Sequence, residues 1–339
     1  MLWLVALATP AAAHAVAGED ASNLLTRLLS IAPEVSGLHL EVIENGNRLE
    51  LTNNTGQEIV ILGYQDEPYL RVGPDGVAEN VRSPATYLNR DRDATTAVPG
   101  SADADAEPEW SQISDGNVAR WHDHRVHWMR DDDPQAARDA PGERHTVQEW
   151  LVTMRAGDTL VEGRGDLVWI PGPSPLPWLA LAAGLFVVTT VASWSDAWRP
   201  AVAAALAVLI VADIVHAVGV TLASPAGLGS QVGNIFSGGG IVSVLGWIVG
   251  IVGLVLLVRG RATGLVAAAF AGMLIAFNGG ISDLGGLSRS QIIFAWPENL
   301  ARAATVVALG IGLGLLAGCG SRIVRSGLPA MESEPATAT

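Results

Sequence analysis

Five apolar stretches in the second half of the sequence restrict the fold more than any other feature. They cover residues 177–194, 200–222, 238–258, 262–280 and 300–319. Each contains about 18 to 23 residues, which is enough for a helix to cross a hydrocarbon core of about 30 Å. The sequence therefore predicts a bundle of about five transmembrane helices within residues 177–325.

Arginines in the short connections predict how this bundle is oriented. Arg199 lies between the first and second stretches, Arg259 and Arg261 lie between the third and fourth, and Arg322 and Arg325 follow the fifth. The connection between the second and third stretches contains neither Arg nor Lys. Because basic loops stay in the cytoplasm, the chain is expected to be a multi-pass protein of the cell membrane with its N-terminal half outside. Residues 326–339 are then expected to form a disordered cytoplasmic tail.

The first residues have the features of an export signal. Residues 1–13 form a short apolar run, and Ala11 and Ala13 satisfy the A-x-A pattern that signal peptidase cleaves. Cleavage after Ala13 would make His14 the first residue of the mature chain, whereas cleavage after Ala15 would remove it. The predicted organisation is a signal peptide over 1–13, an extracytoplasmic domain over 14–170, a Pro-rich hinge over 171–176 and the helical domain over 177–325.

Charge is divided unevenly along the chain. Residues 14–170 contain 28 Asp or Glu and 13 Arg, whereas the rest of the 339 residues contain 6 acids and 7 Arg. An acidic domain of this kind lacks the basic surface that nucleic acids require. A nucleic acid is therefore not an expected partner, and the partners expected from the features below are a metal ion, membrane lipid and an envelope protein.

Apolar and polar residues mostly alternate between residues 37 and 170, a pattern typical of β-strands. Segments 38–44, 47–53 and 57–63 show it, and Asn-Gly and Asn-Thr-Gly turn signals separate them. With further segments around the Gly73–Gly76 turn and after residue 117, seven or eight short strands are expected. This frequency of short strands favours a β-sandwich of immunoglobulin or cupredoxin type. The polar segments 91–109 and 131–138 are expected to be loops.

A group of histidines carries the candidate chemistry of this domain. His122, His124 and His127 lie in the sequence WHDHRVHWM. On a continuous strand His122 and His124 point to one face, and His127 to the other unless the strand ends or bulges. Two imidazoles on one face suit Cu(II), Zn(II) or Ni(II), of which Cu(II) binds most tightly. A mature N-terminal His14 would add its amine and Nδ1, and the single Cys319 excludes a Cys-based site within one chain.

The same segment also has a structural interpretation. Trp121, Trp128 and Arg125 could form a packed surface in which the histidines bond to Asp123 or to the backbone. The chain would then be a structural or interaction protein whose β-domain recruits an envelope partner without a metal. No Walker A loop, G-x-S-x-G elbow or H-E-x-x-H motif occurs. No catalytic residue is therefore predicted, and an enzyme is the less favoured interpretation.

Four polar residues stand out in the apolar half of the sequence. Asp213 and His216 are three residues apart within 200–222, so they lie on one side of a helix. Asn278 and Asp283 lie at the end of the stretch 262–280. Because ionisable groups inside a membrane are costly and often functional, these residues are candidates for an ion or metal relay. The alternative is a buried polar group that fixes helix packing.

The layout of these features resembles that of copper proteins. A mature chain that starts with His, followed by His-x-His in a β-domain ahead of membrane helices, resembles the copper-site arrangement of particulate methane monooxygenase B subunits. The matching positions are His14, His122 and His124. The mature start is also similar to that of CopC-like periplasmic copper proteins. The resemblance implies a membrane-anchored extracytoplasmic copper protein, accessory to copper handling or transport.

A second resemblance concerns the exported half. The strings EPYLRVGPDGVAENVRSPATYLNR and ARWHDHRVHWM resemble a family of uncharacterised actinobacterial membrane proteins. This resemblance implies the same architecture, an exported β-domain ahead of membrane helices, and brings no activity with it.

Overall fold

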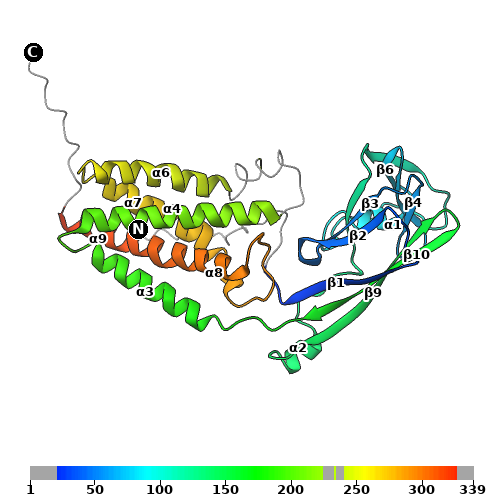
Figure 1. Ribbon diagram of the computed structural model, residues 1–339, viewed down its shortest axis with the longest axis horizontal. Coiled ribbons are helices and arrows are strands. Elements are labelled where there is room, and N and C mark those ends of the chain that lie inside the picture. The colour runs from blue at the N-terminus through cyan, green and yellow to red at the C-terminus, as the bar shows by residue number, and fades with distance from the viewer. Residues whose placement is uncertain (1–20, 224–232, 234–239, 327–339) are drawn as a thin grey trace, which may run out of the picture. The chain divides into compact units, whose positions relative to one another are not determined.

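The computed structural model describes residues 21–223, 233 and 240–326. The chain divides into two compact units, a β unit over Ser22–Gly172 and a helical unit that begins at Pro173 (Figure 1). Each unit is described by itself. The predicted signal peptide over 1–13, His14 and residues 327–339 of the predicted tail lie outside the described residues.

Two antiparallel sheets form the β unit. The larger sheet contains, in spatial order, β1 (Leu24–Ala32), β10 (Thr159–Trp169), β9 (His145–Ala156), β4 (Ile59–Leu62), β5 (Pro68–Gly73), β6 (Gly76–Asn80) and β7 (Trp110–Ser114). The smaller sheet contains β2 (Leu38–Ile43), β3 (Arg48–Asn53) and β8 (Val118–His122). The connections include a 3-10 turn, η1 (Glu44–Gly46), and two short helices, α1 (Pro84–Leu88) and α2 (Gln135–Asp139).

Alternation along the strands builds one core from both sheets. In β3, Leu49 and Leu51 are fully buried while Glu50 between them points away from the core. These leucines pack in the same cluster as Met154 and Val161, which come from the larger sheet. The predicted antiparallel β region is therefore confirmed, and the segments expected at 38–44, 47–53 and 57–63 correspond to β2, β3 and β4.

The structure corrects the sequence-based expectation in three places. Strand β1 precedes the region where strands were expected, and its register pairs Leu24 with Trp169 at the far end of the unit. Strand β7 lies just after the predicted 91–109 loop and pairs with β6. Helix α2 begins within 131–138, which was expected to be a loop, because Pro134 precedes four residues of good or moderate helix propensity, Gln-Ala-Ala-Arg.

The helical unit contains long apolar helices. They are α3 (Leu176–Ala192), α4 (Trp198–Ala223), α6 (Gly240–Val258), α7 (Gly264–Ile275), α8 (Glu298–Val307) and α9 (Leu313–Ser326). A π-helical turn, η2 (Ala276–Ile281), extends α7, another, η4 (Ala308–Gly312), joins α8 to α9, and a 3-10 turn, η3 (Leu284–Leu287), follows η2. Among the described residues, four of the resulting helices are long and apolar enough to cross a membrane, namely 198–223, 240–258, 264–281 and 298–326. Helix α3 is apolar but only 17 residues long.

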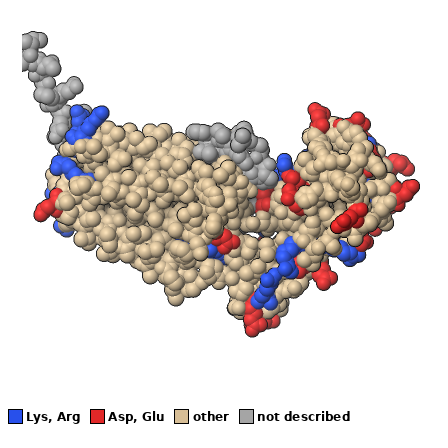
Figure 2. Space-filling model, viewed as in Figure 1, with Lys and Arg blue, Asp and Glu red and all other residues tan. Residues whose placement is uncertain are grey.

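Small residues let these helices approach closely. A Cβ added to Gly272 of α7 would lie 2.6 Å from the carbonyl oxygen of Gly312 in η4, and the reverse distance is 2.8 Å. Glycine pairs of this kind are typical of helix packing in membranes, where backbones meet directly. The outward surface carries apolar side chains such as Val188 and Val258. The visible face of this unit is almost without charge along its length (Figure 2).

Arginines and tryptophans gather at one end of the helical unit, which we call the arginine end. The guanidinium carbons of Arg199 and Arg322 lie 4.7 and 4.6 Å from the centroid of the Trp198 ring. Arg325 lies 3.9 Å from the Trp194 ring. Aromatic and basic side chains are enriched where helices meet the membrane surface, so the arginine end has the composition of an interfacial layer.

Candidate functional site

The histidines of the β unit lie in a turn that follows β8. The strand ends at His122, and residues 123–128 form what we call the histidine turn. The Asp123 carboxylate accepts the backbone N–H of Arg125 at 3.1 Å, and the Asp123 carbonyl accepts that of Val126 at 3.0 Å. This local bonding by an aspartate competes with strand pairing and ends the strand. Strand alternation therefore does not place His124 beside His122.

Asp123 is the fixed centre of this turn. Its side chain is completely buried and accepts hydrogen bonds from Trp121 Nε1 at 3.0 Å and from Arg125 Nε and Nη2 at 2.8 and 2.7 Å. Arg125 also donates to the carbonyl of Leu62 at 3.2 Å and lies over the ring of Tyr64. A buried charge pair satisfied in this way holds the backbone in place. Asp123 therefore fixes the backbone that carries the histidines. Its carboxylate is occupied by Trp121 and Arg125, so we do not count it among the candidate metal ligands.

Each histidine of the segment uses one ring nitrogen to bond a backbone carbonyl. The pairs are His122 Nδ1 with Asn47 O at 3.0 Å, His124 Nε2 with Asp91 O at 3.1 Å, and His127 Nε2 with Arg92 O at 3.0 Å. In each pair the ring N–H donates, because a carbonyl can only accept. Whenever such a ring is neutral, its other nitrogen carries a lone pair. Histidines that bind metals are oriented by the same kind of hydrogen bond.

Hydrogen bonds fix the start of the long loop 91–109, which supplies two of these three carbonyls. The Asp91 carboxylate accepts the backbone N–H groups of Asp93, Thr95 and Thr96 and both threonine hydroxyls. These hydrogen bonds, led by the one from the Thr95 backbone, hold the pKa of Asp91 well below its usual range. The carbonyls of Asp91 and Arg92 therefore have fixed positions against the rings of the histidine turn.

His124 and His127 are the two rings that meet. Their centroids are 5.4 Å apart in an edge-to-face arrangement, and His124 also stacks on Tyr64 with centroids 6.2 Å apart. His127 is only 5% exposed, and its Nδ1 is buried without a hydrogen-bond partner. Burial above all, together with the charges of Arg92, His124 and His122, lowers the pKa of His127 to about 4. His127 is therefore neutral near pH 7, the state that can bind a metal.

His122 is close to this pair and has a related environment. Burial, followed by the charge of Arg48 and a smaller contribution from His124, lowers its pKa. Its Nδ1 is committed to Asn47, so Nε2 is the nitrogen with a lone pair. His122 is therefore a neutral imidazole near the pair. The backbone carbonyl of Asn47, the residue just before strand β3, holds this ring in place.

The spacing of the two rings fits a shared metal ion. Metal–nitrogen bonds of about 2 Å place an imidazole centroid about 3 Å from the ion, so two ligands at a tetrahedral angle have centroids about 5 Å apart. The observed separation is 5.4 Å. Within residues 21–223, 233 and 240–326, no three His, Cys, Asp or Glu side chains converge closely enough to hold a metal ion. These residues therefore supply at most a two-imidazole site.

The helical unit brings together the four polar residues singled out from the sequence. Trp247 Nε1 donates to Asp213 at 2.7 Å, and Asn278 Nδ2 donates to the Ser243 hydroxyl at 2.9 Å. His216 Nδ1 lies 3.7 Å from Asp283 Oδ2. Sequence reasoning missed Ser243 and Trp247, although a serine and a tryptophan within an apolar stretch are signals that could have been used. We call this group the acid cluster, and it is a second candidate site. Its members are Asp213, His216, Ser243, Trp247, Asn278 and Asp283.

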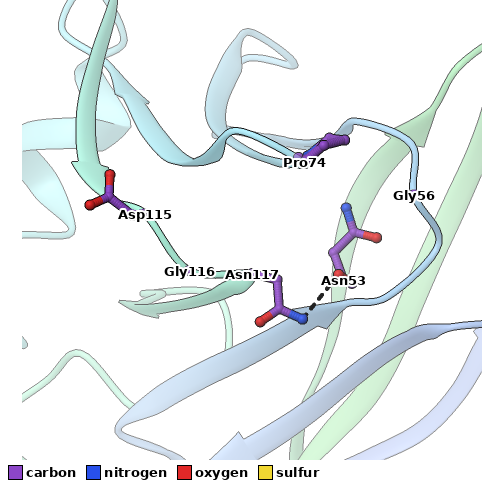
Figure 3. A pocket seen from close by; sticks show the side chains of 7 residues that line it. Asn53, Gly56, Pro74, Asp115, Gly116 and Asn117 are labelled. Atoms are coloured by element: carbon purple, nitrogen blue, oxygen red, sulfur yellow. Dashed lines mark hydrogen bonds between the residues drawn. The ribbon is translucent and has the colours of Figure 1, made fainter.

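A small hollow in the β unit offers less chemistry. It measures about 260 Å³ and is enclosed by turns between strands (Figure 3). Its lining residues are Asn53, Gly56, Gly73, Pro74, Asp115, Gly116 and Asn117. Asn117 Nδ2 donates to the Asn53 carbonyl at 3.2 Å across it. With one carboxylate and no other ionisable group in its lining, the hollow provides neither a ligand set nor an acid–base pair.

The described residues thus form an acidic antiparallel β unit and an apolar helical unit, in which four helices are long and apolar enough to cross a membrane. No protein-family model, curated protein or solved structure matches the chain.

Proposed function

We propose that the protein is a membrane-anchored, extracytoplasmic copper-binding protein, accessory to copper handling or transport. In this proposal residues 1–13 are an export signal, and the β unit is a sandwich of immunoglobulin or cupredoxin type outside the cell. The arginine end then faces the cytoplasm, as the positive-inside rule requires. The observation that carries the proposal is the buried, unpartnered Nδ1 of His127 beside His124.

The geometry favours His124 and His127 as the primary pair over His122 and His124. The Nε2 atoms of both rings bond adjacent carbonyls, so the Nδ1 atoms are the nitrogens left for an ion. A buried polar atom without a partner is uncommon and calls for a functional explanation. A site of neutral imidazole nitrogens favours Cu(II) among divalent first-row metals. His122 Nε2 also carries a lone pair, but no third His, Cys, Asp or Glu side chain of the described residues converges with His124 and His127.

His14 can complete the set if processing exposes it. The hydroxyl of Thr26 in β1 donates to the carbonyl of Val126 at 2.7 Å, so the first strand runs beside the histidine turn. Thr26 lies twelve positions after His14, and a chain of that length spans up to about 40 Å. The N-terminal amine and Nδ1 of His14 can therefore reach the ion. The proposed ligand set is therefore His124 and His127 with the mature His14.

The alternative is a protein that recruits an envelope partner without a metal. The buried Asp123–Arg125 pair and the three histidine–carbonyl bonds would equally serve a rigid packed turn. A recognition surface needs such rigidity as much as a metal site does. Only the unpartnered nitrogen of His127 favours the metal over this alternative.

Copper titration of the purified full-length protein tests the proposal. We expect one Cu(II) per chain with an electron paramagnetic resonance spectrum showing nitrogen ligands. His127→Gln keeps a donor for the Arg92 carbonyl but removes the Nδ1 lone pair, and we expect it to weaken binding on the order of 100-fold or more. His39→Gln, at an exposed position of β2, is the matched control and should leave binding unchanged. Equal copper binding by wild type and His127→Gln would exclude the proposed site.

A further inference from the structure

The acid cluster is buried deep in the helical unit and is not used by the proposed copper site. Asp213 is 3% exposed on α4. It lies 15 residues beyond Trp198, which is about 22 Å along the helix from the arginine end. In a hydrocarbon core of about 30 Å this position lies past the middle. The cluster is therefore reached more easily from the end opposite the arginines.

Asp213 is surrounded by neutral hydrogen-bond donors. Trp247 Nε1 donates to it at 2.7 Å, and Ser243 contributes a second side-chain hydrogen bond. Ser243 in turn accepts from Asn278 at 2.9 Å, so a chain of polar groups leads across three helical segments. A Cβ on Gly279 would lie 2.5 Å from Asp213 Oδ1. The backbone of η2 is therefore in close contact with this carboxylate, and π-helical turns often mark functional sites.

The charged groups around Asp213 are few. In the described part of the helical unit the acid–base pairs are His216 with Asp283 and Arg302 with Glu298. Asp213 belongs to neither pair. The facing side chains from α6 and η2, Ser243, Trp247 and Asn278, carry no charge.

Arg302 is not available as a partner for Asp213. It is buried at the start of α8 and donates to the carbonyls of Gly286 and Arg289 and to Glu298. These bonds hold the segment after η2 in place against α8. The titratable groups that interact within the cluster are Asp213, His216 and Asp283, whereas Arg302 and Glu298 pair with each other.

This set of groups does not balance its charge when fully ionised. Asp213 and Asp283 are close enough for their charges to interact. Two carboxylates with one protonated histidine leave one net negative charge. An ionised carboxylate without a cation is very costly in a low-dielectric interior. One additional proton makes the cluster neutral.

We propose that the Asp213 and Asp283 carboxyls share one exchangeable proton in the helical bundle, loaded through His216. The proton comes from water at the end opposite the arginines and passes through His216 to the two carboxyls. Release returns it to water by the same groups. The inference does not depend on the copper site.

Phe294 covers the entrance to this path. Its ring stacks on His216 with centroids 5.8 Å apart and fits against Gly219, where an added Cβ would lie 2.1 Å from the ring. The segment is anchored because Ala295 N donates to the Gly219 carbonyl at 3.0 Å. Phe294 therefore shields one face of the His216 ring. Proton exchange in the wild type should therefore be slower than in Phe294→Ala.

Infrared difference spectroscopy of the full-length protein in detergent, recorded against pH, tests the proposal. We expect a carbonyl stretching band of a protonated carboxylic acid that disappears at high pH and is lost in Asp213→Asn. Trp247→Phe removes the donor to the carboxyl, so it should shift the frequency of this band without removing it. Asp196→Asn, in the exposed loop between α3 and α4, is the matched control and should leave the band unchanged.

The outcomes separate the proposal from its alternatives. A band that persists in Asp213→Asn would assign the proton elsewhere and overturn the proposal. Loss of the band on adding NaCl at fixed pH would also overturn it, in favour of a metal cation. Should Asp213→Asn fail to fold, the frequency shift in Trp247→Phe decides, because that variant leaves every titratable group in place; an unchanged frequency there would count against the proposal.

Discussion

The histidine turn and the acid cluster contain similar residue types but resolve their buried charges in different ways. In the histidine turn Asp123 is neutralised by Arg125, two residues further along, and the polar atom left over is a neutral nitrogen of His127. In the acid cluster Arg302 bonds to backbone carbonyls and to Glu298, and the Asp213 carboxylate accepts hydrogen bonds from the neutral side chains of Trp247 and Ser243. A lone pair on a neutral nitrogen favours a metal ion, whereas a buried carboxylate without a cation favours a proton.

Removing the Asp123 carboxylate should have the largest effect on stability. Asp123→Ala leaves the Arg125 guanidinium buried without its partner, and we expect the free energy of unfolding of the β unit to fall by about 3–5 kcal/mol. Denaturant unfolding followed by tryptophan fluorescence measures it. Asp132→Ala, in exposed pairs with Arg130 and Arg138, is the control and should cost less than about 1 kcal/mol. Similar losses in the two variants would show that the turn does not depend on Asp123.

The neutral state of His127 should appear as a pH dependence of stability without metal. The pKa of His127 is about 4 in the folded protein and 6.5 as its ordinary value. Because only the unfolded chain binds the proton between these values, stability is complete above pH 6.5 and falls as the pH is lowered to about 4. The loss is at most about 3 kcal/mol.

Comparison of variants attributes this pH dependence to His127. Unfolding measured in EDTA across this pH range should show the slope in wild type and in His39→Gln, and a clearly smaller slope in His127→Gln. A slope that survives in His127→Gln would mean that other groups carry it.

Crowding the entrance of the acid cluster should have a smaller effect. Gly219→Ala places a methyl group against the Phe294 ring, and we expect it to destabilise the helical unit by about 1–3 kcal/mol relative to Gly184→Ala. Gly184 has open space around its Cβ position on α3, so alanine there should be neutral or stabilising. Thermal unfolding in detergent measures both variants. Equal stabilities would show that Phe294 does not pack in the Gly219 notch.

Local pattern was sufficient for the parts of the fold that depend on local sequence. Alternation located β2, β3 and β4 to within two residues, and apolar length located the membrane helices. Strand β1 was missed because its partner, β10, lies more than a hundred residues further along the chain. The end of β8 was missed because the side chain of Asp123, and not a glycine or proline, breaks the strand.

In the candidate sites, too, local spacing predicted which residues lie together on one element, but it did not predict their partners from other elements. Helical spacing places Asp213 and His216 on one side of α4, as expected. Their partners, Trp247 for Asp213 and Asp283 for His216, come from other segments, and no spacing within one helix encodes which segments pack together. The pairing of His124 with His127 likewise follows from the turn geometry and the Asp91 loop, and not from the three-residue spacing alone.

The pairing of the first strand with the last has a consequence for how the β unit forms. Strand β1 bonds only to β10 in the larger sheet, so it has no sheet partner until residues 159–169 are available. Long-range pairing of this kind is slow, because a large loop must close before any contact compensates for the lost entropy. During synthesis the N-terminus emerges first, so β1 remains without a sheet partner while the strands from β2 to β10 are made. The side of the histidine turn that Thr26 contacts is completed in that last step, so the site matures only when synthesis has reached the membrane helices.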